Sequence, residues 1–490
     1  MSDLPILFRS ATELAQQIRQ GLLTSAEVVD AHVRQIERWN PRIQAMVSLR
    51  AEEALREAAE ADQARQRGQP LGPLHGVPIT LKDSLRVRGV SSTYGGLPGF
   101  ARHKPSQDCR LMERLRRAGV IVLGRTNLPL LALNWQCDNP FFAECVNPWD
   151  DARTPGGSSG GAAAALAAGF SPLDLGSDLG GSIRYPAHCC GVLGLRTTVG
   201  LLPADDIGPE GMAMTLQHLL SLGPMARSIP DLSLMLDVLT ESAPARRVSK
   251  TLSDPKLRIA VTPSMPGSEP DAATAALLEA LCAGLRTDGH QIEIGSAPSV
   301  DLDAAWRIWG IIAGFEFWQG VPTVANNPLT RFLFRSYMLK YKLGDGPFTD
   351  SFFAGMTASR RAYEEALVQQ QSLLQRVDSF FNRYAMWLLP VCMGEAIHRQ
   401  RRGSPIQVGL RSVPYSQYLG AYTVPTTVFE TPVLTLPVGL GSAGLPVGIQ
   451  VHGPRFADRQ LLEAAQRALG RFVSVQIPPL LRQDSAAPPT

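Results

Sequence analysis

Residues 155–168 read PGGSSGGAAAALAA, a glycine- and serine-rich loop that leads into an alanine-rich helix. The glycines let the backbone approach a ligand closely, while the serines present hydroxyl groups. A flexible linker has the same composition, but a linker does not normally lie between ordered elements. A phosphate-binding loop also precedes a helix, yet the Lys-Ser or Lys-Thr pair of a P-loop is missing. A nucleophile elbow would use Gly157, Ser159 and Gly161, but residues 151–155 are not the apolar strand that this turn follows.

A second glycine-rich segment follows about one helix later, at residues 175–184, and reads LGSDLGGSIR. Two glycines precede Ser182, so its hydroxyl can project into a site while successive backbone N–H groups point the same way. That arrangement stabilises the oxyanion that develops during acyl transfer. The alternative is a turn in which Ser182 only caps a helix. The presence of two such loops in one chain favours a catalytic site.

Lys82 ends the apolar run VPITL at residues 77–81. This position predicts burial, which disfavours the charged ammonium form of a lysine. Lowering a lysine pKa from about 10.4 to about 7 corresponds to about 4.6 kcal/mol, which is within the range of buried lysines. A neutral amine can then act as a base. An ion pair with Asp83, or an ammonium that reaches solvent from the strand end, explains the position equally well.

The composition is that of a globular protein with a small-molecule partner. Of 490 residues, 44% are hydrophobic and 19% are charged, which is enough for a large core. A net charge of +3 gives no basic surface of the kind that binds nucleic acid. Seven cysteines without the spacing of a disulfide framework suit a reducing compartment.

The sequence predicts neither a resident metal nor a membrane span. It contains no CxxC or HExxH motif, so no metal site is expected. Residues 1–20 lack the basic start and apolar stretch of a signal peptide, and apolar runs of about 18 residues do not occur. We therefore expect a cytoplasmic protein.

Helical and strand patterns alternate along the chain, which predicts a single α/β domain over residues 1–490. Helices are expected at 24–38, 51–67, 108–118, 162–168, 228–239 and 271–285, and strands at 77–81, 120–123, 257–261, 291–294, 432–438 and 447–451. The tract between the helices at 162–168 and 228–239 is glycine-rich and reads as irregular. The expected parts are an N-terminal helical region at 10–69, a catalytic core at 70–240, a helical and aromatic-rich insertion covering the site at 300–420, and a loose tail at 479–490.

The region 300–420 contains an aromatic cluster that either lines an apolar pocket or packs in the core. Its members are Trp306, Trp309, Phe315, Phe317, Trp318, Phe332, Phe334, Tyr337 and Tyr341. Positions 306, 309, 313 and 317 have the spacing of one buried helical stripe, which favours core packing over a pocket.

Taken in order, three motifs resemble the amidase signature family: GVPITLKD at 76–83, GGSSGG at 156–161 and DLGGSIRYP at 178–186. The resemblance extends to GRTN at 124–127, NPW at 147–149, GVLGLR at 191–196 and GLPVGIQ at 444–450. It covers the chain except for much of 300–420. The segments NLP at 127–129 and QCDNP at 136–140 are more similar to the fatty acid amide hydrolase branch.

This resemblance implies a fold, a triad and a supporting set of residues. The fold is three-layer α/β/α around a mixed twisted sheet. Lys82 is the base, Ser158 is a bridging serine preceded by a cis peptide bond, and Ser182 is the nucleophile that forms an acyl-enzyme. No metal or organic cofactor takes part. The backbone N–H groups of Leu179, Gly180, Gly181 and Ser182 hold the oxyanion, and the supporting residues are Ser159, Ser177, Asp178 and Arg184. The ion pair of Asp178 with Arg184 is expected to be partly buried and to brace the loop.

The expected substrate is a small linear amide, hydrophobic or aryl, and carbamates or esters are compatible with the same acyl-enzyme. A homo-oligomer is compatible with the motifs, which leave the oligomeric state open. The alternative function is that of the glutaminase component of a glutamyl-tRNA amidotransferase, which works within a complex. That component carries an acidic and serine-rich segment after the Gly-x-Thr-Asn motif, where this chain has LLALNW at 130–135.

Overall fold

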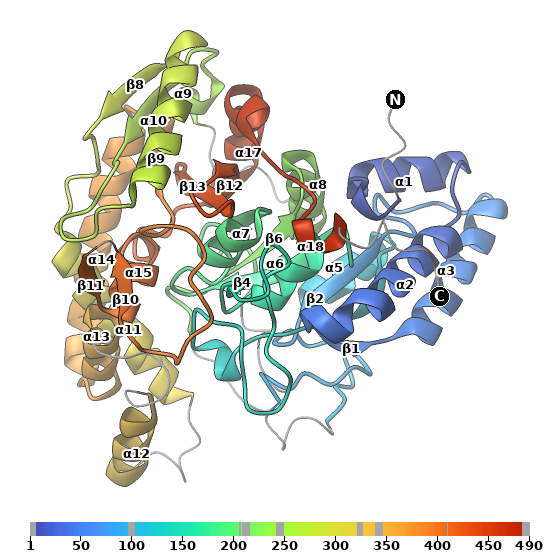
Figure 1. Cartoon of the computed structure of the whole chain (residues 1–490), viewed down its shortest axis with the longest axis horizontal. Helices are drawn as coiled ribbons and strands as arrows, with labels where there is room; N and C mark the ends of the chain where they lie inside the picture. The colour runs from blue at the N-terminus through green and yellow to red at the C-terminus, as the bar shows by residue number, and fades with distance from the viewer. Residues whose placement is uncertain are drawn as a thin grey trace.

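The computed structural model describes residues 6–96, 103–204, 207, 216–241, 249–320, 327–338, 346–408 and 410–482. In this part of the chain, eleven strands form one mixed sheet in the order β1-β3-β2-β4-β6-β5-β12-β13-β9-β7-β8, with helices on both faces (Figure 1). The strands are β1 Met46–Leu49, β2 Pro78–Lys82, β3 Ile121–Thr126, β4 Leu173–Asp178, β5 Leu193–Arg196, β6 Ser221–Ala226, β7 Arg258–Val261, β8 Gln291–Ile294, β9 Met386–Pro390, β12 Val433–Leu440 and β13 Pro446–His452. A separate ribbon pairs β10 Ile406–Val408 with β11 Arg411–Val413. The three-layer α/β fold expected from the family resemblance is confirmed.

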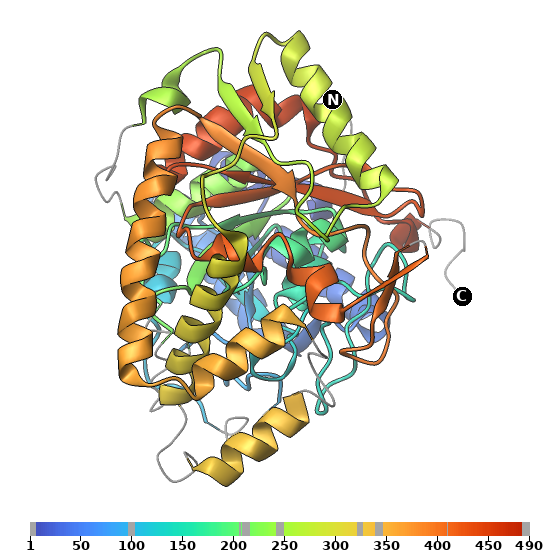
Figure 2. The same cartoon turned by 90° about the vertical axis from the view of Figure 1, so that its left-hand side faces the viewer.

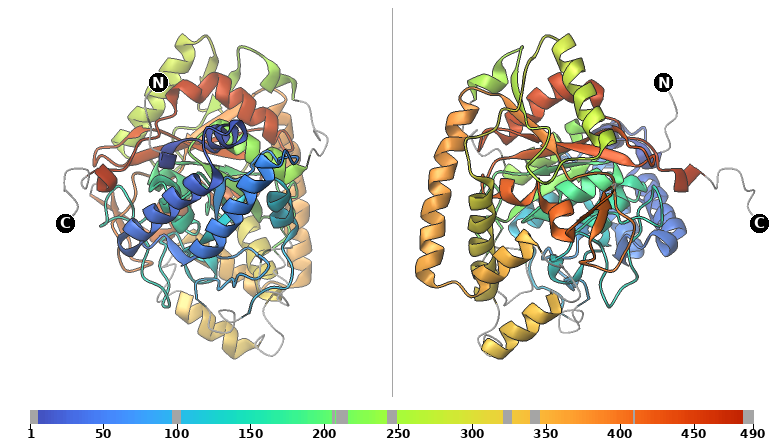
Figure 3. Two further views of the ribbon diagram at one scale, coloured as in Figure 1. Left: turned by 90° about the vertical axis from the view of Figure 1, so that its right-hand side faces the viewer. Right: turned by 60° about the vertical axis from the view of Figure 1, so that its left-hand side comes forward.

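The helices divide between the two ends of the sheet and its centre. Helices α1 to α3 cover one end, as the left view of Figure 3 shows, and α11, α13 and α14 lie side by side at the other end (Figure 2). The α-helices are α1 Ala11–Gln20, α2 Ser25–Ile43, α3 Ala51–Gln66, α5 Arg110–Arg117, α6 Gly160–Ala167, α7 Arg184–Cys190, α8 Ile229–Thr240, α9 Lys250–Ser253, α10 Ala272–Thr287, α11 Leu302–Gln319, α12 Pro328–Met338, α13 Pro347–Met356, α14 Arg360–Phe381, α15 Tyr415–Gly420, α16 Val424–Thr427, α17 Asp458–Leu469 and α18 Pro479–Arg482.

Helix α2 begins where the capping residues predict. The Thr24 hydroxyl accepts a hydrogen bond from the Glu27 N–H at 3.1 Å, and Glu27 Oε2 accepts one from the Thr24 N–H at 2.7 Å. This reciprocal pair satisfies two backbone donors that would otherwise have no partner at the helix start.

In its described residues, the glycine-rich tract between α6 and α8 contains regular structure, where the sequence indicated an irregular segment. It contains three strands of the central sheet, β4, β5 and β6, together with α7. Glycine is uncommon in strands, so the pattern indicates a loop. A Cβ on Gly223 of β6 would overlap the carbonyl oxygen of Leu195 on β5, and a Cβ on Gly194 would press against Ile183. Glycine is therefore needed here because backbones approach closely.

The region 300–420 forms α11 to α14, as expected, but it also contributes to the central sheet. Strand β9 pairs with β13 on one side and with β7 on the other. The run of consecutive helices α11 to α14 thus ends at Phe381, and α15 follows β9 and the β10–β11 ribbon. At the C-terminus, α18 buries Leu480, while residues 483–490 of the expected loose tail lie outside the described residues.

The fold brings the catalytic motifs to one edge of the sheet. Strands β2 and β4 are parallel neighbours, with Leu81 opposite Leu175, so their carboxyl ends lie side by side. Lys82 ends β2, and Ser177 and Asp178 end β4. Clefts at the carboxyl ends of parallel strands are where α/β sheets generally bind ligands.

Candidate active site

Lys82 lies at the centre of a cluster of serine oxygens. Its side chain is fully buried. Its Nζ is within hydrogen-bond distance of three hydroxyl oxygens: Ser158 Oγ at 2.7 Å, Ser159 Oγ at 2.9 Å and Ser177 Oγ at 3.0 Å. An ammonium group has three N–H donors and can donate to all three oxygens. After loss of one proton, the amine has a lone pair that can accept a proton from a hydroxyl.

Burial lowers the pKa of Lys82 to about 7, although the charges of Asp178 and Asp174 oppose this shift. Removing an ammonium from water disfavours its charged form, and here that effect exceeds the attraction of the carboxylates. A substantial fraction of Lys82 is therefore neutral near pH 7, which is the protonation state that a general base requires.

The two glycine-rich loops contact one another directly. The Ser159 N–H donates to the Ser182 carbonyl oxygen at 3.0 Å, and the Gly157–Ser158 peptide bond is cis, as the family resemblance predicts. Ser158 and Ser159 are buried, whereas Ser182 is partly exposed. Within the described residues, the Ser182 hydroxyl makes no hydrogen bond. Of the serines in these loops, Ser182 is thus the one whose hydroxyl is open to a ligand.

Asp178 and Arg184 form an ion pair that is fully buried, rather than partly buried as expected. Arg184 Nη2 and Nε donate to the two carboxylate oxygens at 2.8 and 3.0 Å. The same carboxylate accepts the backbone N–H groups of Gly181 at 2.8 Å and Ile183 at 3.0 Å. Burial alone would raise the pKa of Asp178, but Arg184 and these donors hold that pKa well below its usual range. These contacts hold residues 178–184 around the carboxylate, and neither Asp178 nor Arg184 lines the cavities described below.

The predicted oxyanion donors differ in their contacts. The N–H of Gly181 is engaged with Asp178, as described above. The N–H groups of Leu179, Gly180 and Ser182 make no hydrogen bond within the described residues. Gly180 is buried, and buried backbone N–H groups in proteins nearly always have a partner, so its N–H in particular suits an oxygen supplied by a ligand.

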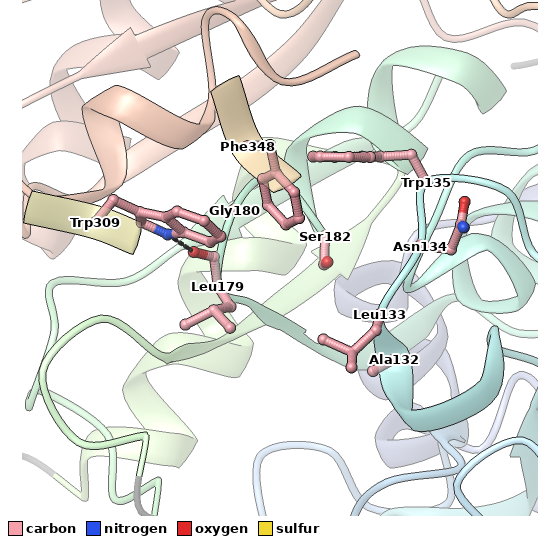
Figure 4. A pocket seen from close by; sticks show the side chains of 9 residues that line it. All are labelled: Ala132, Leu133, Asn134, Trp135, Leu179, Gly180, Ser182, Trp309 and Phe348. Atoms are coloured by element: carbon pink, nitrogen blue, oxygen red, sulfur yellow. Dashed lines mark hydrogen bonds between the residues drawn. The ribbon is translucent and has the colours of Figure 1, made fainter. Parts of the chain in front are cut away.

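A cavity of about 330 Å³, including its part open to solvent, lies next to Ser182 (Figure 4). Its aromatic walls are Trp135, Trp309 and Phe348, with ring centroids 4.6 Å apart for Trp135 and Phe348 and 4.5 Å apart for Trp309 and Phe348. We call it the aromatic cavity. The remaining lining residues are Ala132, Leu133, Asn134, Leu179, Gly180 and Ser182.

A second hollow, of about 440 Å³, shares part of this wall and also reaches Ser182. Unlike the aromatic cavity, it is lined by Ser158 and Ser177, and we call it the relay-side cavity. Its other lining residues are Ser84, Tyr94, Leu131, Ala132, Leu133, Leu179, Ile207, Leu216, Leu220 and Phe317. The described residues that line the two cavities include no charged side chain.

Members of the aromatic cluster both pack in the core and line a cavity, which are the two roles that the sequence left open. Trp309 and Phe317 are buried and also line cavities, whereas Trp306, Phe315 and Trp318 line neither. Of the other members, Phe332 is exposed, Phe334 packs against Phe317 and Trp318, and Tyr341 and the side chain of Tyr337 lie outside the described residues.

Trp135, Phe348 and Thr423 are among the residues at this site that sequence reasoning missed. Thr423 Oγ1 donates to the carbonyl oxygen of Gly180 at 3.0 Å. None of the three lies in a motif whose spacing indicates catalysis. Only the three-dimensional proximity of distant segments identifies them.

No group of three or more potential metal-ligating side chains occurs among the described residues. Likewise, no helix in this part of the chain is long and apolar enough to cross a membrane.

The site is thus a buried lysine among serines at the carboxyl ends of two parallel strands, in a mixed α/β sheet that is covered by helices. The family model "Amidase" matches residues 27–462, and the chain belongs to the amidase signature family of amide hydrolases.

Individual relatives fall into two functional groups. An indoleacetamide hydrolase of Bradyrhizobium diazoefficiens is 30% identical over 480 residues, covering 94% of this chain and 86% of that protein. The GatA-type component of the glutamyl-tRNA(Gln) amidotransferase of Moorella thermoacetica is 31% identical over 493 residues, covering 94% and 96%. The solved structure of a bacterial aryl acylamidase has the same fold, with a TM-score of 0.79 at 24% identity, covering 99% of this chain and 100% of that chain. Sequence identity alone does not separate the two groups.

Proposed function

We propose that this amidase hydrolyses linear amides with hydrophobic or aryl acyl groups through an acyl-enzyme on Ser182, with Ser158 and Lys82 as a proton relay. The observation that carries the proposal is the contact between Lys82 and Ser158. Lys82 is fully buried and its pKa is lowered to about 7, and Ser182 opens to an apolar cavity beside it. Carbamates and esters meet the same chemical requirement, a carbonyl carbon with a leaving group.

In the proposed first step, neutral Lys82 takes the proton of the Ser158 hydroxyl, and Ser158 takes the proton of Ser182. Ser182 Oγ bonds to the carbonyl carbon, and the π electron pair moves to the carbonyl oxygen. The N–H groups of Leu179, Gly180 and Ser182 stabilise that oxyanion. When the C–N bond breaks, Ser158 donates a proton to the leaving nitrogen and regains one from Lys82. In the second half, water gives a proton to Ser158, which passes one to Lys82, and the water oxygen bonds to the acyl carbon. The ester bond to Ser182 then breaks, Ser182 regains a proton through Ser158, and the acid is released. Ser159 and Ser177 hold the Lys82 amine in place.

The residues that line the two cavities favour an uncharged substrate. Burying an ionic group without a charged partner is costly, and the described cavity walls supply none. Aromatic walls favour a flat, apolar acyl group because aromatic pairs gain energy beyond simple burial. The related indoleacetamide hydrolase points the same way, because an indolylacetyl group is an aromatic acyl group.

The position of Ser158 supports an assignment of the two cavities. Ser158 must approach the nitrogen that it protonates, and it lines the relay-side cavity but not the aromatic cavity. The leaving amine therefore points toward the relay-side cavity, and the acyl group fills the aromatic cavity. Because the relay-side cavity is largely apolar, the amide nitrogen is proposed to tolerate an apolar substituent.

Labelling with a fluorophosphonate tests the nucleophile. Wild-type protein is expected to take up one label at Ser182, and Ser182→Ala is expected to take up none. Ser84→Ala is a matched control, because Ser84 lines the relay-side cavity and makes no contact with the Lys82 amine. Equal labelling of wild type and Ser182→Ala would rule out Ser182 as the nucleophile. Hydrolysis of p-nitroanilides and esters with graded acyl groups would then define the substrate.

The second candidate function is the glutaminase of an amidotransferase complex. It is favoured by the 31% identity to the Moorella protein, which extends over 96% of that protein. The apolar walls around Ser182 favour the first candidate.

A further inference from the structure

Trp309 of α11 contacts the candidate site in two ways. Its ring forms a wall of the aromatic cavity, and its indole Nε1 donates to the carbonyl oxygen of Leu179 at 2.9 Å (Figure 4). Leu179 begins the loop that leads to Ser182, whereas Trp309 lies 130 residues later in the sequence. One buried side chain thus contacts both the aromatic cavity and the backbone of the proposed oxyanion site.

The hydrogen bond fixes the direction of a backbone donor. A peptide unit is planar and trans, so its C=O and N–H point in opposite directions. With the Leu179 carbonyl held toward Trp309, the N–H of Gly180 points away from α11. Gly180 is buried and lines the aromatic cavity, and its N–H has no acceptor within the described residues.

This peptide unit needs such an anchor because Gly180 has no Cβ. Without a side chain, both orientations of the Leu179–Gly180 peptide are sterically accessible. The following unit is anchored separately: the Gly180 carbonyl accepts from Thr423 Oγ1 at 3.0 Å, and the Gly181 N–H donates to Asp178 at 2.8 Å. In the described structure, Trp309 is the side chain that holds the Leu179 carbonyl.

We infer that Trp309 is a positioning residue that couples the acyl group in the aromatic cavity to the oxyanion-binding N–H of Gly180. This inference rests on the proposed role of Ser182. An acyl group that packs on the indole holds the ring in the position at which Nε1 bonds Leu179. Part of the binding energy of the acyl group then stabilises the transition state. Selectivity among acyl groups is therefore expressed in kcat more than in KM.

The test replaces the indole N–H without changing the ring volume. Benzothienylalanine at position 309 has sulfur in place of the N–H and keeps the bicyclic shape, and Trp309→Phe is a second variant. Removing an oxyanion donor typically costs about 10²- to 10³-fold in kcat. Misorienting one of three donors should therefore lower kcat about 10- to 100-fold for arylacetyl esters and leave KM within about threefold. Affinity for an arylboronic acid, which mimics the tetrahedral adduct, should fall by the same factor as kcat.

Two further variants separate coupling from simple packing. Trp306→Phe is the matched control on α11, because Trp306 lines neither cavity, and its kinetics should equal those of the wild type. Thr423→Val should lower kcat equally for acetyl and arylacetyl esters, since Thr423 does not line the aromatic cavity. The benzothienylalanine protein should instead lose the wild-type preference in kcat for arylacetyl over acetyl.

A rise in KM with unchanged kcat in the benzothienylalanine protein would overturn the inference and leave Trp309 as a wall only. An unchanged acyl preference in kcat would also overturn it. Failure of the proposed function gives a different result, because wild-type protein would then show no label at Ser182 and no turnover of any ester or amide.

Discussion

Lys82 determines the pH dependence expected for this enzyme. Its neutral form is the proposed base, and burial lowers its pKa to about 7. The neutral fraction increases as the pH rises through that value, so kcat/KM for an amide without titratable groups should increase between pH 6 and 8 and level off above. A pH-rate profile measured with an aryl p-nitroanilide checks this. A flat profile across that range would contradict a base with this pKa.

Replacing Lys82 by Ala should remove most of the activity. General-base catalysis typically contributes about 10²- to 10⁴-fold, and a loss of that size is expected between pH 6 and 8. Lys256→Ala is a suitable control, because Lys256 is exposed, lines neither cavity and donates to the carbonyl oxygen of Asp288 at 2.6 Å. Unchanged turnover in Lys82→Ala would exclude Lys82 as the base.

Asp178→Asn should lower the free energy of unfolding of the protein as well as its rate of catalysis. Removing one partner of a buried ion pair leaves the charge of Arg184 uncompensated, which typically costs about 3–5 kcal/mol in the free energy of unfolding. Urea denaturation at pH 7 measures this loss. Asp237→Asn is the control, since the Asp237–Arg459 pair is about half exposed and such pairs contribute about 0–1 kcal/mol.

The pH dependence of this difference has a defined sign. The pKa of Asp178 is lowered in the folded protein, so its stabilising contribution is present above the unfolded value of about 3.9. It is lost as the pH falls through the much lower folded pKa. The difference in unfolding free energy between wild type and Asp178→Asn should thus be constant from pH 5 to 7 and shrink at more acidic pH. A difference that grows on acidification would contradict the assignment.

Sequence patterns predicted some residues of the site better than others. The end of an apolar run predicts burial of Lys82, and the structure has it fully buried among serines. The DLGGSIR motif placed Asp178 and Arg184 together. For Trp309, helical spacing favoured core packing, and the residue is indeed buried, but it also lines the cavity and bonds a carbonyl from a distant strand end. Helical periodicity identifies the inward face of a helix and not what lies opposite it.

At the level of elements, glycine explains why the sequence did not predict strands β4, β5 and β6. Strands β4, β5 and β6 each contain a glycine where strand patterns favour β-branched residues, namely Gly176, Gly194 and Gly223. A Cβ on Gly223 would overlap the backbone of β5 and one on Gly194 would overlap Ile183, whereas a Cβ on Gly176 would lie tightly, at 3.1 Å, against neighbouring side chains. The starts of helices α2, α8 and α10 could be predicted from the sequence, because each begins at a side chain that caps it.

The short 3-10 helix η2, Leu130–Ala132, offers a test of the cavity assignment. Leu131 is partly exposed and lines the relay-side cavity but not the aromatic cavity. Leu131→Trp should fill the relay-side cavity and lower kcat/KM for an N-benzyl arylacetamide at least about tenfold, because overpacking costs about 1–3 kcal/mol. The primary arylacetamide, which releases only ammonia, should change less than about threefold.

The exposed Leu329 of α12 provides the matched control for this element. Leu329→Trp makes the same chemical change away from both cavities and should leave both substrates unaffected. Equal losses for the two amides in Leu131→Trp would show that the leaving amine does not occupy the relay-side cavity.

At the scale of the whole molecule, the site joins two regions of the chain that lie far apart in sequence. The relay comes from β2, β4 and the loop before α6, whereas the aromatic walls Trp309 and Phe348 come from α11 and α13. Trp135, the third aromatic wall, comes from the same part of the chain as the relay, and Trp309 bonds the loop that leads to Ser182, so the acyl cavity wall and the reacting groups are built together.

The two candidate functions differ in the charge of the substrate that the whole site has to accommodate. Free glutamine carries an ammonium and a carboxylate at pH 7, and the described cavity walls offer no charged partner to either group. Placing such unpaired ions in an apolar cavity costs at least about 1–3 kcal/mol each, so glutamine should be hydrolysed with less than about 1% of the kcat/KM of an arylacetamide. Ammonia release from both substrates measures this ratio for the purified chain, alone and with the other components of an amidotransferase. Glutamine turnover that equals or exceeds that of the arylacetamide under either condition would support the glutaminase and reject the proposed preference for hydrophobic amides.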